Sequence, residues 1–338
     1  MRQIATVLHQ CSDRTFTIFD ASVSQAFSSQ STLQERGEHC SMDPDRLGSL
    51  ALAPGSQIRV RRNLEEMALY TVSETRQEAN PCTVRMSFAG RQRLGTEYEF
   101  DAIIDTRVPH PTFSDQEAQA YSELVERLDD NGCQQELIVI APHGGAIERE
   151  TDRQAERVAS LLGGNRASVW RCKGFKSGGG AFERWHITST DIHVSSFPLL
   201  KTIRSRGFAH AVAFHGFSEA GVLIGGAAPM TLKRKIADAL EKALAGSGIH
   251  VRVADPSENY DGDSARNIVN RLTAGGANGV QIEQSLEARD RFWKPIADAV
   301  ASVYSRTRVA PAIRTTAAHG APRRGRSVPR PRRGRRVV

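Results

Sequence analysis

The sequence has few cysteines and no long apolar run, and each shortage excludes a class of protein. No segment of the 338 residues approaches the roughly 18 to 20 apolar residues of a membrane-spanning helix, so we expect no membrane partner. The N-terminus lacks the basic and then apolar order of a secretory signal, which favours a cytoplasmic protein and leaves release by lysis open. Five cysteines are scattered without a Cys-x-x-Cys pair, which argues against a disulfide framework or a zinc ribbon.

Acidic residues are absent from the C-terminal segment 306–338, although the whole chain holds 38 of them. This segment contains 11 arginines, so the net charge of +7 divides into a tail of +11 and a body of −4. The body is therefore not a basic nucleic-acid-binding domain. The tail cannot bury enough apolar surface to fold, so we predict that it is disordered. It is either an arm that binds a polyanion weakly or a solvated extension without a partner.

The first third of the chain divides into two segments of different character. Residues 1–44 are rich in Ser, Gln and Thr without sustained periodicity, which predicts a poorly ordered leader. Residues 45–112 contain short apolar and β-branched runs between Gly, Pro and Asn, which predict a small antiparallel β-module. These runs cover residues 56–62, 67–74, 82–88 and 97–105.

Residues 113–305 predict one α/β domain. Helical patterns alternate there with continuous apolar runs, which are typical of strands buried on both faces. We therefore predict three layers around a mixed, mostly parallel sheet. The predicted helices cover 115–128, 149–162, 195–206, 228–245 and 287–306, and the predicted strands cover 136–141, 167–172, 209–214, 249–254 and 278–283.

Polar residues with metal-binding side chains follow three of the predicted strands. His143 comes just after the first, with Glu148 beyond a Gly-Gly pair; His215 ends the second and Glu283 the third. Ligands bind beyond the carboxyl ends of strands in open α/β sheets, so these side chains are the first candidates for a site. Each histidine alone is also compatible with a buried core imidazole. Two strand-end His-Gly pairs in one sheet favour the three protein ligands of a catalytic zinc.

Five short strings in order along the chain carry a family resemblance. APHGGAIE, WHITST, AFHGF, NIVNR and GVQIEQS, within about residues 135–305, resemble the poly-γ-glutamate hydrolase family of bacteria and their phages. The resemblance implies a fold similar to that of the zinc carboxypeptidases. It also implies zinc-dependent hydrolysis of γ-glutamyl amide bonds in an acidic polymer or peptide. It does not extend to the leader, the β-module or the tail.

The resemblance implies roles for individual residues. His143, Glu148 and His215 would hold Zn²⁺. Glu283 would be the general base that activates water and the acid that protonates the leaving nitrogen. An exposed polar position at a strand edge is the alternative for Glu283. No Gly-x-Ser-x-Gly motif or phosphate-binding P-loop offers a competing site.

The substrate-binding residues have open alternatives. We predict that Arg271, with Asn270 beside it, binds a substrate carboxylate, because a guanidinium group pairs with a carboxylate bidentately. A helix-surface arginine is the alternative for Arg271. His186 either lines the pocket or orients a metal ligand. The chain departs from the family pattern after His186, since an acidic pair is missing and His193 is displaced, so the role of His193 stays open.

The sequence leaves two other functions open. One is a zinc amidohydrolase or carboxypeptidase that acts on another acidic peptide or on an N-acyl amino acid. The other is a non-catalytic nucleic-acid-binding or phage-related protein that acts through the basic tail. The slightly acidic body cannot attract a polyanionic substrate by net charge, so local basic groups must meet the substrate carboxylates.

Overall fold

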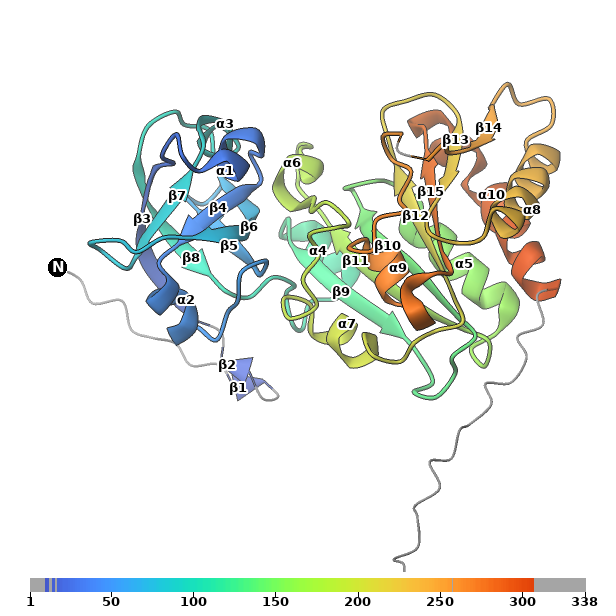
Figure 1. Cartoon of the computed structure of the whole chain (residues 1–338), viewed down its shortest axis with the longest axis horizontal. Helices are drawn as coiled ribbons and strands as arrows, with labels where there is room; N and C mark the ends of the chain where they lie inside the picture. Colours follow the sequence, from blue (N-terminus) through green and yellow to red (C-terminus); the bar gives the residue numbers. More distant parts are fainter. Residues whose placement is uncertain (1–9, 12–13, 16, 257, 307–338) are drawn as a thin grey trace, which may run out of the picture. The chain divides into compact units, whose positions relative to one another are not determined.

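The computed structural model in Figure 1 describes residues 10–11, 14–15, 17–256 and 258–306. The described residues belong to one compact unit. The predicted tail lies outside the described residues except for Arg306, so its disorder and its affinity for polyanions stay predictions. Among the described helices, none is both long enough and apolar enough to cross a membrane.

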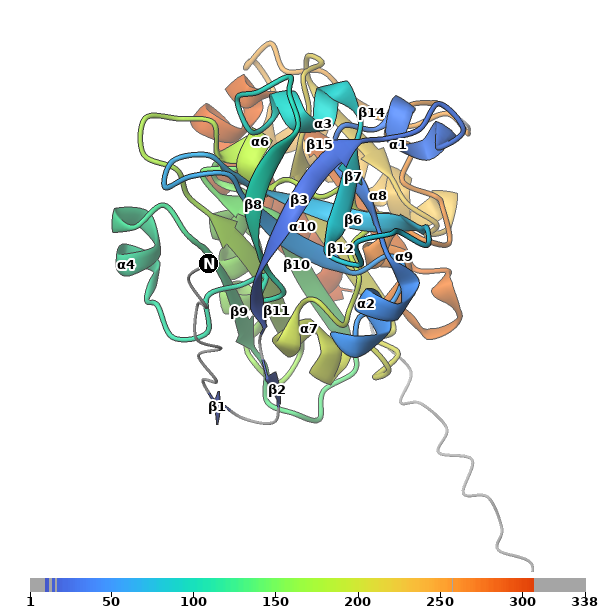
Figure 2. The ribbon, with the colours of Figure 1, turned by 90° about the vertical axis from the view of Figure 1, so that its left-hand side faces the viewer.

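A closed six-stranded β-barrel forms the N-terminal part of the described chain. Its strands follow the order β3-β7-β4-β6-β5-β8, and Figure 2 shows β3 between β7 and β8. β3 runs parallel to β7 and β4 runs parallel to β6, so the prediction of an antiparallel module is wrong for these two pairs. The elements of this region are β1 (Gln10–Cys11), β2 (Arg14–Thr15), β3 (Ile18–Gln25), α1 (Ser31–Glu35), β4 (His39–Met42), α2 (Pro44–Ser49), β5 (Gln57–Arg61), β6 (Met67–Thr75), β7 (Thr83–Met86), α3 (Phe88–Gln92) and β8 (Phe100–Asp105).

Two barrel strands, β3 and β4, lie within residues 1–44, where the composition predicts a poorly ordered leader. In β3 the burial alternates, since Ala21 and Val23 are buried in the barrel core while Asp20 is exposed. Polar residues fill the outward positions and conceal this alternation from a reading of composition. The barrel therefore begins at Ile18 and not near residue 45.

A seven-stranded sheet in the order β14-β13-β15-β12-β10-β11-β9 forms the centre of the second region. The sheet is mixed, as predicted: the pairs β9–β11 and β13–β15 are antiparallel, and its other neighbouring strands are parallel. The central strands β10, β12 and β15 are parallel, so their carboxyl ends share one edge. The elements are α4 (Asp115–Ala120), β9 (Leu124–Asp129), β10 (Leu137–Gly145), α5 (Thr151–Leu162), β11 (Ala167–Gly174), α6 (Ala181–Trp185), α7 (Pro198–Ile203), β12 (His210–Gly216), β13 (Val222–Gly225), α8 (Met230–Ala243), β14 (Val251–Val253), α9 (Ile268–Arg271), η1 (Ala274–Gly276), β15 (Gly279–Gln284) and α10 (Leu286–Arg306).

Apolar side chains cover both faces of this sheet, which explains why its strands read as continuous apolar runs. Along β10, Val139 faces the core formed with α5, α8 and α10, whereas Ile138 and Ile140 face the core formed with α7 and α9. Each face thus buries a layer of helices, and the region has three layers.

The structure differs from the prediction of one helix over residues 115–128. The helix α4 ends at Ala120, and β9 pairs antiparallel with β11 at the sheet edge. Glu126 is buried on β9, where its carboxylate accepts hydrogen bonds from the Trp170 indole (2.7 Å) and from the Leu200 backbone (2.7 Å). These partners come from distant parts of the chain, so a helical period within the segment cannot anticipate them.

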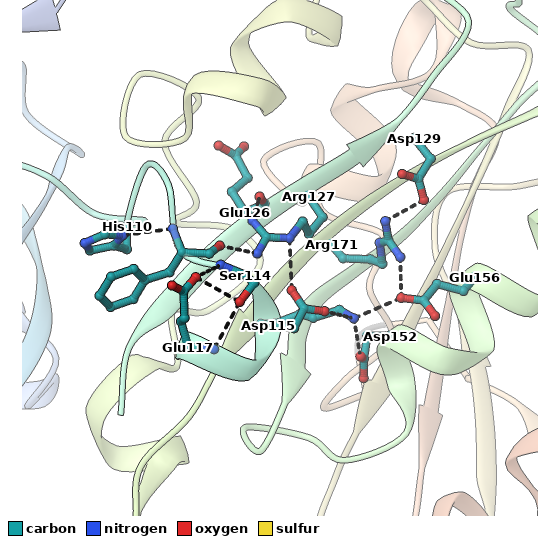
Figure 3. Close-up of polar contacts among 12 residues, drawn as sticks. His110, Ser114, Asp115, Glu117, Glu126, Arg127, Asp129, Asp152, Glu156 and Arg171 are labelled. Carbon is teal, nitrogen blue, oxygen red and sulfur yellow. Dashed lines mark hydrogen bonds and ion pairs between the residues drawn. The ribbon is translucent and has the colours of Figure 1, made fainter. Parts of the chain in front are cut away.

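A network of charged side chains fastens α4, α5 and β9 to β11 (Figure 3). At its centre the buried ammonium of Lys173 lies 2.9 Å from Asp115, 3.0 Å from Asp152 and 2.9 Å from Glu156. Burial alone would lower the pKa of Lys173, but the three carboxylates outweigh it and raise that pKa. Lys173 therefore stays charged in the folded protein.

Replacing Lys173 with Met should leave three carboxylates close together without their cation. We expect the free energy of unfolding to fall by about 3 kcal/mol, because removing one partner of a buried ion pair strands the other. Denaturant unfolding of the Lys173→Met protein measures this. The control Lys235→Met alters an exposed lysine on α8 and should change the free energy by less than about 0.5 kcal/mol. Equal losses in the two variants would contradict the role assigned to the network.

Candidate functional site

His143 lies near the end of β10, with its ring orientation set by the backbone. Its Nε2 donates a hydrogen bond to the carbonyl of Ile187 (2.8 Å), and in the neutral ring this leaves a lone pair on Nδ1. The backbone N–H of Glu148 donates to the His143 carbonyl (2.8 Å) and closes a tight loop. The loop returns the Glu148 carboxylate to the imidazole.

Glycine is required at both positions that follow His143. A Cβ at Gly144 would lie 2.7 Å from the Cβ of Asp152. Gly145 has a φ of +70°, and a Cβ there would lie 2.9 Å from the carbonyl oxygen of Gly174. The N–H of Gly145 donates to Asp152 (3.2 Å), which also pairs with Lys173. The charge network of Figure 3 thus extends to the loop that holds His143.

Three donor atoms meet at the carboxyl edge of the sheet. The Nδ1 atoms of His143 and His215 are 3.1 Å apart, and the Glu148 carboxylate lies 3.1 Å from the first and 3.5 Å from the second. Ligands about 2.1 Å from a tetrahedral zinc are separated by about 3.4 Å, so this spacing fits such an ion. Two lone pairs facing each other beside a carboxylate require a proton or a metal cation among them. The residues present therefore fit a zinc ion.

The pKa shifts of these three groups also indicate that the cluster attracts positive charge. Burial alone would lower the pKa of His143, but the Glu148 carboxylate outweighs it and raises that pKa. Burial lowers the pKa of His215. Burial would raise the pKa of Glu148, yet the two imidazoles hold it well below its usual value. The carboxylate is thus ionised and the cluster attracts a cation.

Glu283 lies on β15 directly opposite His215 on β12. The amide of Gln281 donates to its carboxylate (2.8 Å), and Asn267 donates to Gln281 in turn (2.6 Å). Burial, followed by the charge of Glu148, raises the pKa of Glu283 well above the usual value. A carboxyl group with these neighbours is suited to taking up and releasing a proton.

A cavity of about 740 Å³ opens above this cluster. His143, Glu148, His215 and Glu283 all line it, and so does His186. The structure therefore brings together five of the seven residues proposed from the sequence. Their catalytic and metal-binding roles stay predictions.

His186 offers a second arrangement of possible ligands. Ligand atoms of His143, Glu148 and His186 all lie within 4.8 Å of one another. Nε2 of His186 is 3.8 Å from Glu148, however, which is farther than the nearest nitrogen of His215. Burial and the neighbouring His143 lower the pKa of His186 well below its usual value, so its imidazole is neutral. We therefore favour His215 as the third ligand and leave His186 as a neutral group of the cavity wall.

Arg271 and Asn270 are not among the residues that line this cavity. The Arg271 guanidinium donates to the carbonyl of Ile192 (2.9 Å), and the Asn270 side chain bonds backbone groups, including the carbonyl of Gly262 (2.9 Å). These contacts connect loops, and they do not favour the predicted carboxylate clamp. His193 also lies outside the lining, with its ring accepting from a backbone N–H (3.3 Å).

A loop beside the cavity is anchored by Asp191. Its carboxylate lies 2.7 Å from Arg36, 3.2 Å from His39 and 3.0 Å from Arg266. Glu38, His39 and Asp191 also bring possible ligand atoms within 4.8 Å of one another, but these ion pairs already satisfy the Asp191 carboxylate. Residues 188–190, which precede Asp191, line the cavity, so the ion pairs hold part of its wall.

The region that contains this candidate site matches a known protein family. Residues 114–309, more than half of the chain, match the family model described as poly-gamma-glutamate hydrolase. The chain belongs to this family. The resemblance inferred from the five sequence strings is thus confirmed, and this hydrolase has its candidate site within the matched region.

Solved structures resemble separate parts of the hydrolase. A bacteriophage poly-gamma-glutamate hydrolase is 24% identical over 53% of this chain and 87% of its own, with a TM-score of 0.43. YndL in its zinc-free apo form is 21% identical over 54% of this chain and 90% of its own, also at 0.43. The designed protein mkDPBB_sym2 is 19% identical over 26% of this chain and 96% of its own, at 0.22. No curated protein matches the chain.

Two residues that line the cavity are not among those proposed from the sequence. Arg289 lies three residues into the pattern of the closing helix, and Gln281 is one polar residue within an apolar strand. Gln281 could have been noticed because a polar side chain two residues before Glu283 shares its face of the strand. Nothing local distinguishes Arg289 from its charged neighbours.

Replacing Gly145 with Ala should displace the His143 loop. The positive φ and the contact with Gly174 both oppose a Cβ, so we expect a loss of about 1 to 2 kcal/mol in stability and weaker metal binding. Metal content and thermal unfolding measure these effects. Gly178 is a matched control, because its φ is +77° but a Cβ added there would have no other atom within 4 Å. Gly178→Ala should keep the metal, and equal metal loss in both variants would refute the crowding argument.

Proposed function

We propose that this hydrolase is zinc-dependent and cleaves γ-glutamyl amide bonds, with poly-γ-glutamate as its substrate. The spacing of the three donor atoms on His143, Glu148 and His215 is the observation that carries the proposal. Membership of the family supports the choice of bond. The roomy cavity, with a buried proton-accepting carboxylate beside the cluster, supports hydrolysis.

In this proposal His143, Glu148 and His215 hold the metal. Zinc, when bound there, lowers the pKa of a water molecule and polarises the scissile carbonyl. The N–H of Gly216 donates to Glu148 (2.9 Å) and the Ile187 carbonyl accepts from His143, so both ligands are oriented by backbone groups. Such partners fix the direction of a ligand before the metal arrives.

Glu283 moves the proton. Its carboxylate accepts a proton from the attacking water and later delivers it to the nitrogen of the leaving glutamyl unit. The Gln281 amide, held by Asn267, engages one oxygen of the carboxylate and fixes its orientation, and in this proposal the other oxygen carries out the transfer. No covalent enzyme intermediate is needed.

Substitutions should distinguish residues that bind the metal from the residue that acts as the general base. His143→Ala and His215→Ala should each abolish stoichiometric zinc binding, because each removes one of three ligands. Glu283→Gln should keep zinc while lowering turnover about 100- to 10,000-fold, since it keeps the shape of the side chain but cannot accept the proton. Zinc content and initial rates measure both effects, with His250→Ala, at an exposed histidine, as the control. Full turnover in Glu283→Gln would assign the base elsewhere.

The substrate can be identified by comparing polymers of the same composition. Purified protein should lower the viscosity of poly-γ-glutamate and leave α-linked polyglutamate intact, with Glu283→Gln as the inactive control. Cleavage of short acidic peptides or N-acyl amino acids in place of the polymer would favour the second enzymatic function. A zinc-free protein without hydrolytic activity on any of these would overturn the proposal.

A further inference from the structure

Arg289 is a buried guanidinium that lines the cavity and whose charge is attracted by nearby carboxylates but not paired with one. The residue is 7% exposed, and among the described residues no carboxylate forms an ion pair with it. Of the described residues that line the cavity, it carries the only guanidinium or ammonium group. Glu148, Asp290 and Glu283 attract this guanidinium without forming an ion pair with it, so it can still bind an anion that enters the cavity.

The backbone fixes this guanidinium next to the metal ligands. Nη1 donates to the carbonyl of Arg149 (3.0 Å) and Nε donates to that of Gln284 (3.4 Å). Nη2 has no hydrogen-bond partner among the described residues. A Cβ at Gly216 would overlap Cζ of Arg289, so the guanidinium rests on the residue that directly follows His215. Glycine at this position makes room for the arginine.

The other charges of the cavity oppose an acidic substrate. Glu148, Glu283 and Asp261 line it, so the described lining holds three carboxyl groups and a single arginine. In a γ-linked glutamyl chain, the carbon attached to the scissile nitrogen carries a free carboxylate. That carboxylate must lie close to the metal when the amide is attacked, and an anion there needs a cation in reach.

We propose that Arg289 binds the α-carboxylate of the glutamyl unit whose nitrogen leaves. The inference rests on the proposed function, and it adds the residue that distinguishes a γ-linked glutamyl bond from an α-linked one. In an internal α-linked peptide bond, the same carbon carries a neutral amide carbonyl. The guanidinium then remains unpaired, which disfavours the wrong linkage. Arg289 thus takes the role that the sequence suggested for Arg271.

Matched substrates test the contact directly. One is a short γ-glutamyl peptide, and the other is the same peptide with the carboxylate beside the scissile nitrogen converted to a primary amide. Wild-type protein should prefer the first by at least about 30-fold in kcat/KM. Arg289→Gln should lose this preference by lowering kcat/KM for the carboxylate substrate alone. Arg291→Gln, on the same helix but exposed and paired with Glu287, should keep it.

A binding measurement separates recognition from turnover. In the inactive Glu283→Gln protein, calorimetry with the carboxylate peptide should show affinity that falls at least about 30-fold when Arg289→Gln is added. Equal losses on both substrates, or a changed pH profile with unchanged preference, would show that Arg289 only balances the charge of Glu148 and Glu283. That result would overturn the inference while the zinc site and hydrolysis stand. A wild-type protein without zinc or activity would instead remove the proposed function itself.

Discussion

Two imidazole nitrogens that face each other beside a carboxylate are the constraint around which the site is arranged. His143 and His215 present Nδ1 atoms 3.1 Å apart, so either a proton or a metal cation bridges them. Neighbouring parallel strands bring the two residues to one edge, and the tight turn after β10 brings Glu148. Three features hold these side chains together. They are the glycines of that turn, the charge network around Lys173 and the backbone groups that bond the proposed ligands.

The site residues that could be predicted are those at the carboxyl end of a buried apolar run. His143, His215 and Glu283 each lie there, on β10, β12 and β15, and the parallel strands bring their side chains to a common edge. Arg289 could not be predicted, because its direction depends on the open space at Gly216, far away in the sequence. Arg271 looked equivalent by composition, yet its guanidinium bonds the backbone of another loop.

Local and distant contacts also decide which elements of the fold can be predicted from the sequence. Four barrel strands were evident because their apolar residues recur within short runs bounded by turn residues. β3 was hidden by polar residues on its outer face, although Ala21 and Val23 alternate as a strand requires. The helical spacing after Asp115 was misleading because β9 derives its place from pairing with β11 and from the buried contacts of Glu126. The apolar pattern of a segment therefore predicts its secondary structure correctly where contacts with distant segments do not determine it.

The strand order of the barrel also determines when its first strand, β3, can pair during translation. β3 pairs with β7 and β8, so residues near position 20 find their partners only near positions 83 and 104. Contacts this distant in sequence form slowly, and β3 keeps at least one unpaired edge until β8 has been synthesised. A nascent chain that pauses before residue 105 would expose that edge to pairing with other chains.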